Sequence, residues 1–131
     1  VSFTFSNTPI NSASFSPSLL LKATGGSATT PQNYIRVSYQ NSTGQVTVTT
    51  VNGGTVNRAR FSATFASGDT LAVTAIQNGT VYVYKNGTAI GAVTIPTSGA
   101  GAWTFGTGGG RIGLLLPTNQ RVDNFNGGTI P

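Results

Sequence analysis

The residue types that carry most protein chemistry are nearly missing from this chain. Cys, His, Met and Glu do not occur, and Asp69 and Asp123 are the two carboxylates. Without Cys and His there is neither a zinc-type nitrogen–sulfur site nor a Cys or Ser–His nucleophile system. Glycoside hydrolysis usually needs two paired carboxylates, and a tight calcium site is disfavoured when both Asp are isolated. We therefore expect no enzyme, no catalytic residue, no metal site and no cofactor.

The charged residues are few and scattered. Seven basic residues give a net charge of +5, but only 7% of the chain is charged. A nucleic-acid binder would cluster its basic residues and interleave them with aromatics, so we expect no nucleic-acid partner. No apolar run approaches the length of a membrane span, so we expect no membrane insertion. A surface of Thr, Ser and Asn suits an extracellular or cell-surface setting.

Four aromatic residues are candidates for stacking on sugar rings. Trp103 lies between two glycine-rich loops, and Tyr82 and Tyr84 share one face of an expected strand, where Tyr34 could join them. The alternatives are structural. A single tryptophan usually packs inside a domain, which is the interpretation that we favour for Trp103. For the tyrosines the favoured alternative is cross-strand packing, with Tyr82 covering Gly91.

Three N-glycosylation sequons begin at Asn41, Asn78 and Asn86. All three fall in expected turns, where a glycan can be attached. A chance origin is the alternative, because the sequence is rich in Asn, Ser and Thr. Asn78 and Asn86 are also required by the turns that they form.

The stretch 69–95 organises the rest of the chain. It contains two Asn-Gly pairs between runs of β-forming residues, and Asn-Gly supplies the two positive-φ positions of a type I′ turn. The pattern predicts a meander of three strands, at 71–77, 80–85 and 88–95. Two-residue turns then place Ile76 opposite Val81 and Val83 opposite Ile90. Both faces of the meander are largely apolar, so we expect it to be covered on both sides or partly buried by a partner.

Short strands and turn signals recur along the remainder of the chain. Residues 1–7 alternate strictly, with Val1, Phe3 and Phe5 on one face. About ten strands and no helical period predict an all-β, two-sheet antiparallel β-sandwich of the jelly-roll kind, without significant helix. The 131 residues form a single domain, in which 126–131 is a glycine-containing tail.

The order of several motifs resembles a known family. GDTLAVTAIQNGTVYVYKNGTAIG, then GGRIGLLL, then RVDNFNGGT, is similar to the later half of laminin-G-like, concanavalin-like jelly-roll domains of secreted prokaryotic proteins. SLLLKAT resembles an earlier core strand of the same family. The resemblance implies a non-catalytic extracellular module. Some relatives bind carbohydrate, some bind proteins, and many are spacers or structural subunits.

In the family a further strand normally precedes the one at 1–7 and pairs with the last strand of the fold. This sequence does not contain that segment. The last strand, RVDNF, would then lose a neighbour. Our first hypothesis is a self-assembling filament or surface-layer subunit, in which copies of the chain join by strand addition and Val1, Phe3 and Phe5 insert into a neighbouring copy. The alternative for 1–7 is an edge strand of its own sheet. The alternative function is a carbohydrate-binding, lectin-like module with a polysaccharide partner, and a plain spacer is the third.

Overall fold

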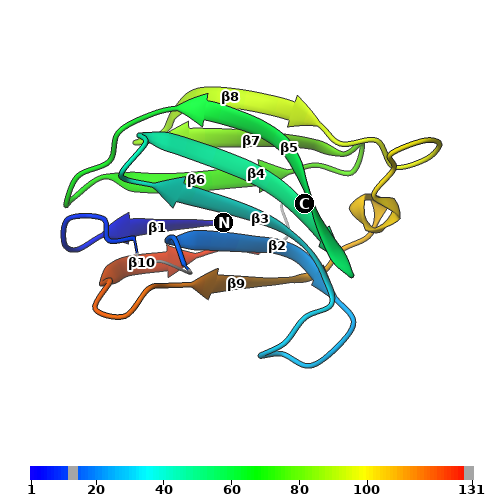
Figure 1. Cartoon of the computed structure of the whole chain (residues 1–131), viewed down its shortest axis with the longest axis horizontal. Coiled ribbons are helices and arrows are strands. Elements are labelled where there is room, and N and C mark those ends of the chain that lie inside the picture. The colour runs from blue at the N-terminus through cyan, green and yellow to red at the C-terminus, as the bar shows by residue number, and fades with distance from the viewer. Residues whose placement is uncertain (12–14, 129–131) are drawn as a thin grey trace.

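The computed structural model describes residues 1–11 and 15–128 and shows two five-stranded antiparallel sheets that overlie each other (Figure 1). The all-β sandwich predicted from the sequence is therefore confirmed. The strands alternate with turns rich in Gly and Asn, and one short 3-10 helix follows the eighth strand. In chain order the elements are β1 (Ser2–Phe5), β2 (Ser18–Thr24), β3 (Asn33–Gln40), β4 (Gln45–Asn52), β5 (Gly54–Ser62), β6 (Thr70–Ala75), β7 (Thr80–Lys85), β8 (Thr88–Thr94), η1 (Thr104–Thr107), β9 (Arg111–Leu115) and β10 (Val122–Asn126).

The two sheets are assembled differently along the chain. One has the strand order β5-β4-β3-β2-β9, so four of its strands are consecutive. The other has the order β10-β1-β6-β7-β8, which brings the first and last strands of the chain together. β1 is thus an interior strand with a partner on each side. The expectation that it would be an edge strand of its own sheet is wrong.

The core lies between the sheets and follows the alternation of each strand. Phe3 and Phe5 on β1, and Val81 and Val83 on β7, are fully buried and point toward the other sheet. Four aromatic rings cluster at one end of the core, with adjacent ring centroids 4.8–6.0 Å apart. Its members are Phe3, Phe5, Tyr39 and Phe65.

The first turn of the meander differs from the prediction by one residue. In the observed register Ala75, not Ile76, lies opposite Val81. The Gly79 amide donates to the Ile76 carbonyl (3.1 Å), and the Ile76 amide donates to the Thr80 carbonyl (2.9 Å), so the loop is longer than a two-residue turn. A one-residue slip exchanges the two faces of a strand. Val81 therefore joins the core, while Ile76 is exposed.

The second turn follows the prediction, but the register of the two strands that it joins does not. Asn86 and Gly87 both have positive φ, as a type I′ turn requires. A bulge then leaves Ile90 without an opposite residue, so Val83 lies opposite Gly91 instead. The Phe61 ring from β5 occupies the space over Gly91, where a Cβ would clash with it. Gly91 is therefore covered by the opposite sheet and not, as predicted, by Tyr82.

Candidate functional site

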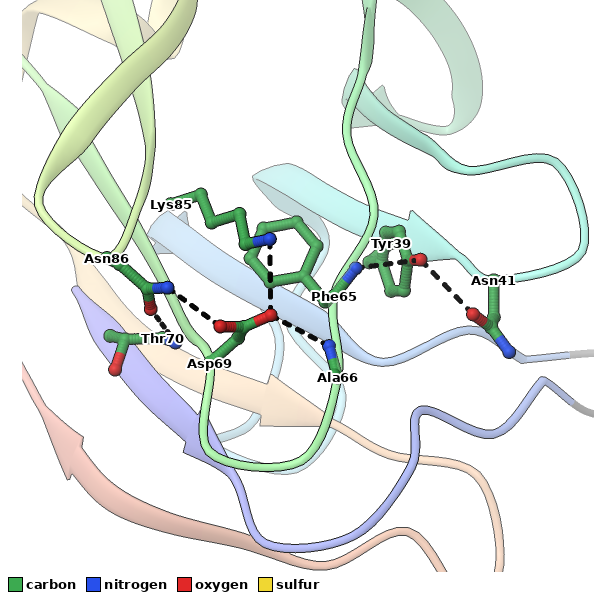
Figure 2. Close-up of polar contacts among 8 residues, drawn as sticks. All are labelled: Tyr39, Asn41, Phe65, Ala66, Asp69, Thr70, Lys85 and Asn86. Carbon is green, nitrogen blue, oxygen red and sulfur yellow. Dashed lines mark hydrogen bonds and ion pairs between the residues drawn. The ribbon is translucent and has the colours of Figure 1, made fainter.

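The carboxylate of Asp69 is the centre of a polar cluster at one end of the sandwich (Figure 2). It accepts hydrogen bonds from the Asn86 side-chain amide (2.7 Å) and the Ala66 backbone amide (2.8 Å), and it pairs with the Lys85 ammonium (3.2 Å). The Asn86 bond, followed by the Ala66 bond and the Lys85 charge, lowers the pKa of Asp69 below its usual value. The Asn86 carbonyl oxygen in turn accepts from the Thr70 amide (2.8 Å). The cluster therefore ties the start of β6 to the β7–β8 turn and keeps an acceptor-only carboxylate ionised.

A second polar contact lies beside this cluster. The Tyr39 hydroxyl accepts from the Phe65 backbone amide (3.1 Å) and donates to the Asn41 side-chain oxygen (3.2 Å), as Figure 2 shows. The Lys85 ammonium lies 5.5 Å from the centre of the Phe65 ring. These contacts fix the 63–69 segment against the core. Among the described residues Lys85 is the titratable group that contacts Asp69, and we refer to the contacts of Asp69 with Ala66, Lys85 and Asn86 as the clasp.

The predicted assembly residues lie inside their own molecule. Phe3 and Phe5 are fully buried, and the Val1 carbonyl accepts from the Val73 amide (2.8 Å). The Phe5 amide donates to the Asp69 carbonyl (2.9 Å), and the Phe5 carbonyl accepts from the Gly68 amide (2.7 Å). A donated β1 would have to leave a position that is filled on both edges and on its inner face. β1 therefore occupies the position beside the last strand, β10, that the resemblance assigned to a missing first strand.

The expectation that the last strand would lack its neighbour is wrong, because β1 lies beside β10. β1 pairs with one side of β10, and no strand of the described chain pairs with the other. Residues 123–126 are exposed, and Phe125 leaves 43% of its surface to solvent. β9 forms the corresponding edge of the other sheet, where Ile112, Leu114 and Leu115 are only half-buried. Backbone groups and apolar side chains are thus presented together at this side of the sandwich.

The aromatic candidates do not form one surface. Trp103 is 3% exposed, its indole N–H donates to the Val51 carbonyl (3.3 Å), and Phe105 packs against it. Trp103 is therefore a core residue, which is the interpretation that the sequence favoured. Tyr82 and Tyr84 lie half-buried on the outer face of their sheet, whereas Tyr34 belongs to the other sheet. The expectation that Tyr34 joins the tyrosine pair is wrong, because β3 and β7 lie in different layers.

Lys22 holds the loop that contains Trp103 in place. The residue has a positive φ of 51°, and its ammonium donates to the Gly106 carbonyl (2.6 Å) and the Gly108 carbonyl (2.9 Å). Partial burial lowers the pKa of this lysine. The two bonds fasten η1 and the start of the glycine-rich loop to β2, which keeps the end of the sandwich closed over Trp103.

All three sequon asparagines are exposed and lie in or beside turns. They differ in how their side chains are used. The Asn86 amide nitrogen is bound to Asp69, and the Asn78 oxygen accepts from the Thr80 amide (2.9 Å). At Asn41 only the oxygen has a partner, the Tyr39 hydroxyl. Glycosylation stays a prediction; among the described residues the side-chain nitrogens of Asn41 and Asn78 have no hydrogen-bond partner, whereas that of Asn86 has one.

Sequence reasoning missed an open hollow of about 460 Å³ between the β2–β3 loop and the β4–β5 turn. Its lining is uncharged and contains three carboxamide side chains. Asn-Gly-Gly between two strands, together with Gln-Asn at the start of β3, was the available signal. The lining residues are Gln32, Asn33, Val51, Asn52, Gly53, Gly54 and Thr55.

Two further observations concern the described residues as a whole. No three or more acidic, His or Cys side chains gather there as the ligands of a metal ion would. No helix among residues 1–11 and 15–128 is long and apolar enough to span a membrane. Comparison of the chain with protein-family models, with curated proteins and with solved structures finds no match.

Proposed function

We propose that this protein is a non-catalytic structural module of an extracellular or cell-surface assembly, in which copies of the chain join by strand addition. The observation that carries the proposal is the free edge of β10, with its exposed residues and the 43% exposed ring of Phe125. An unpaired strand edge is a template for another strand, because every backbone group on it gains a partner. The motif succession that resembles laminin-G-like jelly-roll domains supports the same class of module.

The β5 edge of the other sheet is less suited to such a contact. There Phe61 on β5 packs over Gly91 on β8, which closes the two sheets onto each other. β5 carries two charged side chains, Arg58 and Arg60, whereas β10 carries one, Asp123. Charged side chains on an edge strand are one of the usual means of keeping it from pairing with another chain.

The added strand comes from a second copy of the chain, and it is not β1. β10 and β8 are the two edges of one sheet, so β10 of one copy and β8 of the next would continue that sheet. β8 contains no charged residue over Thr88–Thr94. A head-to-tail contact between two different edges does not close on itself, and it therefore propagates as a filament.

The test compares two substitutions at opposite sides of the sandwich. Phe125→Lys places a charge on the free edge, and Val56→Lys is the matched control because Val56 is 50% exposed on β5. We expect concentration-dependent assembly of the wild type and of Val56→Lys, seen by light scattering and electron microscopy, and a monomer for Phe125→Lys. A wild type that stays monomeric at high concentration would refute the proposal.

A carbohydrate-binding function is the second candidate, favoured by the outer face around Tyr82 and Tyr84. The residues opposite Tyr82 are Thr74 and Ala92, and those opposite Tyr84 are Ala72 and Ala89. Two rings on an uncharged face of small residues can stack on neutral sugars. We expect Tyr82→Ala and Tyr84→Ala to abolish retention on a polysaccharide column that Tyr34→Ala, on the other sheet, leaves unchanged. No retention of the wild type on any polysaccharide would remove this candidate.

A further inference from the structure

Four Asn-Gly pairs lie in the described chain, and the fold restrains them very differently. Their asparagines are Asn52, Asn78, Asn86 and Asn126, and all four are exposed. In an Asn-Gly pair the glycine nitrogen can attack the asparagine side-chain carbonyl, because glycine has no Cβ to hinder the approach. The reaction requires the side chain to leave its partners and the backbone to rotate. Exposure alone therefore does not distinguish the four sites, but hydrogen bonding and packing do.

Two of the pairs are held by their side chains. The Asn86 oxygen accepts from the Thr70 amide (2.8 Å), and its nitrogen donates to Asp69 (2.7 Å). The Asn78 oxygen accepts from the Thr80 amide (2.9 Å), while the Gly79 amide itself donates to the Ile76 carbonyl (3.1 Å). Attack at either site breaks these hydrogen bonds first. Each hydrogen bond of about 1 kcal/mol slows the reaction by roughly fivefold.

The third pair is held by its backbone. Asn126 is the last residue of β10 and lies opposite Ser2 in the ladder. A Cβ on Gly127 would come within 2.7 Å of the Ile112 side chain and 3.2 Å of the Val1 Cα atom. The peptide unit that would carry out the attack is therefore packed against the end of the sandwich.

Asn52 also ends a strand and lies opposite Asn33 and Gly54 in the ladder, but the Asn52-Gly53 pair lacks both the side-chain hydrogen bonds and the packing that restrain the other three. Among the described residues the Asn52 side chain has no hydrogen-bond partner, and no atom lies within 4 Å of the Cβ position on Gly53 or on Gly54. Gly53 has a φ of +68° and forms the tip of the β4–β5 turn. From these observations we propose that Asn52 is a site of spontaneous modification, at which the folded protein loses a side-chain amide.

The reaction needs only water and no change of oxidation state. The deprotonated Gly53 nitrogen bonds to the Asn52 Cγ atom, and the Nδ2 group leaves as ammonia, which gives a five-membered imide. Water then adds to one of the two imide carbonyls and breaks a C–N bond. The products are aspartate or isoaspartate, the second of which carries an extra methylene group in the main chain. Either product places a carboxylate at the rim of the hollow lined by Gln32 and Asn33.

Peptide mapping tests this assignment, because trypsin separates the four pairs. Each Asn-Gly pair falls in a different tryptic peptide. Asn52 lies in 37–58, Asn78 in 61–85, Asn86 in 86–111 and Asn126 in 122–131. The folded protein is incubated at mildly alkaline pH, and samples are withdrawn at intervals. Each sample is digested with trypsin, and the peptide masses are measured by mass spectrometry. We expect the Asn52 peptide to convert first and the Asn86 peptide roughly 30-fold more slowly, from two hydrogen bonds.

Two controls separate the fold from the local sequence. In concentrated urea the four rates should converge, because the restraints are lost. The substitution Asp69→Ala removes one bond to Asn86 and should accelerate that site by about fivefold, without changing the rate at Asn52. Conversion of Asn86 or Asn78 as fast as Asn52 in the folded protein would overturn the proposal, as would an order of rates that urea leaves unchanged.

Discussion

Replacing Phe5 with alanine tests whether β1 is part of the core of its own molecule. The Phe5 side chain is fully buried. Its ring lies 4.9 Å from that of Phe3, 5.6 Å from that of Phe65 and 6.0 Å from that of Tyr39. Truncation leaves a cavity between the two sheets, because backbone hydrogen bonds on both sides hold β1 in place.

The expected loss is a large part of the total stability. Truncating a buried phenylalanine costs about 3–5 kcal/mol, from lost apolar burial and from the cavity that remains. The free energy of unfolding of a typical domain is only about 5–15 kcal/mol. For a chain of this length each kcal/mol lowers the melting temperature by about 3–5 °C, so we expect a decrease of roughly 10–20 °C.

The chain contains a built-in probe for this measurement. Trp103 is the single tryptophan and is 3% exposed, so its fluorescence reports unfolding in urea. Phe125→Ala is the matched control, because its ring is 43% exposed and its removal should cost less than about 1 kcal/mol. A loss for Phe5→Ala no larger than that of the control would refute the placement of β1. In the Phe125→Lys background, where assembly at the β10 edge should be blocked, a midpoint that rises with protein concentration would do the same, because it would indicate that a second copy supplies the strand.

Two further predictions concern acid stability and the contact between the sheets. Because hydrogen bonds hold the pKa of Asp69 below its usual value, this group contributes stability above the unfolded pKa of about 3.9. That contribution is lost as the pH falls through the lower folded value. Asp69→Ala should therefore flatten the acid limb of a urea-midpoint titration. At Gly91 a Cβ would clash with the Phe61 ring. Gly91→Ala should therefore cost about 1–3 kcal/mol, whereas Gly54→Ala, with open space around it, should be near neutral in the same urea assay.

The sequence predicted the strands well because alternation and turn residues are local signals. The strand at 80–85 was predicted with its observed bounds, and Asn86-Gly87 forms the expected type I′ turn. The registers were less predictable, because they depend on contacts between strands. The bulge at Ile90 accompanies the packing of Phe61 over Gly91, and these two residues belong to different sheets.

The candidate sites were predictable only where they depend on neighbouring residues in the chain. The alternation at Val1, Phe3 and Phe5 correctly indicated an inward face, but it could not identify the strands on either side. Those neighbours, β6 and β10, are more than 60 residues away along the chain. For the same reason Tyr34 could not be separated from Tyr82 by pattern alone, since alternation does not assign strands to layers.

The clasp at Asp69 and the free edge of β10 are connected through β1. The Asp69 side chain fixes the 66–69 turn, and the backbone of that turn supplies both hydrogen bonds to Phe5. β1 in turn is the strand that pairs with β10. Protonation of Asp69 in acid weakens the clasp, so it should loosen β1 and then the register of β10. Assembly at the β10 edge should therefore weaken as the pH falls through the folded pKa of Asp69, and Asp69→Ala should weaken it at neutral pH as well.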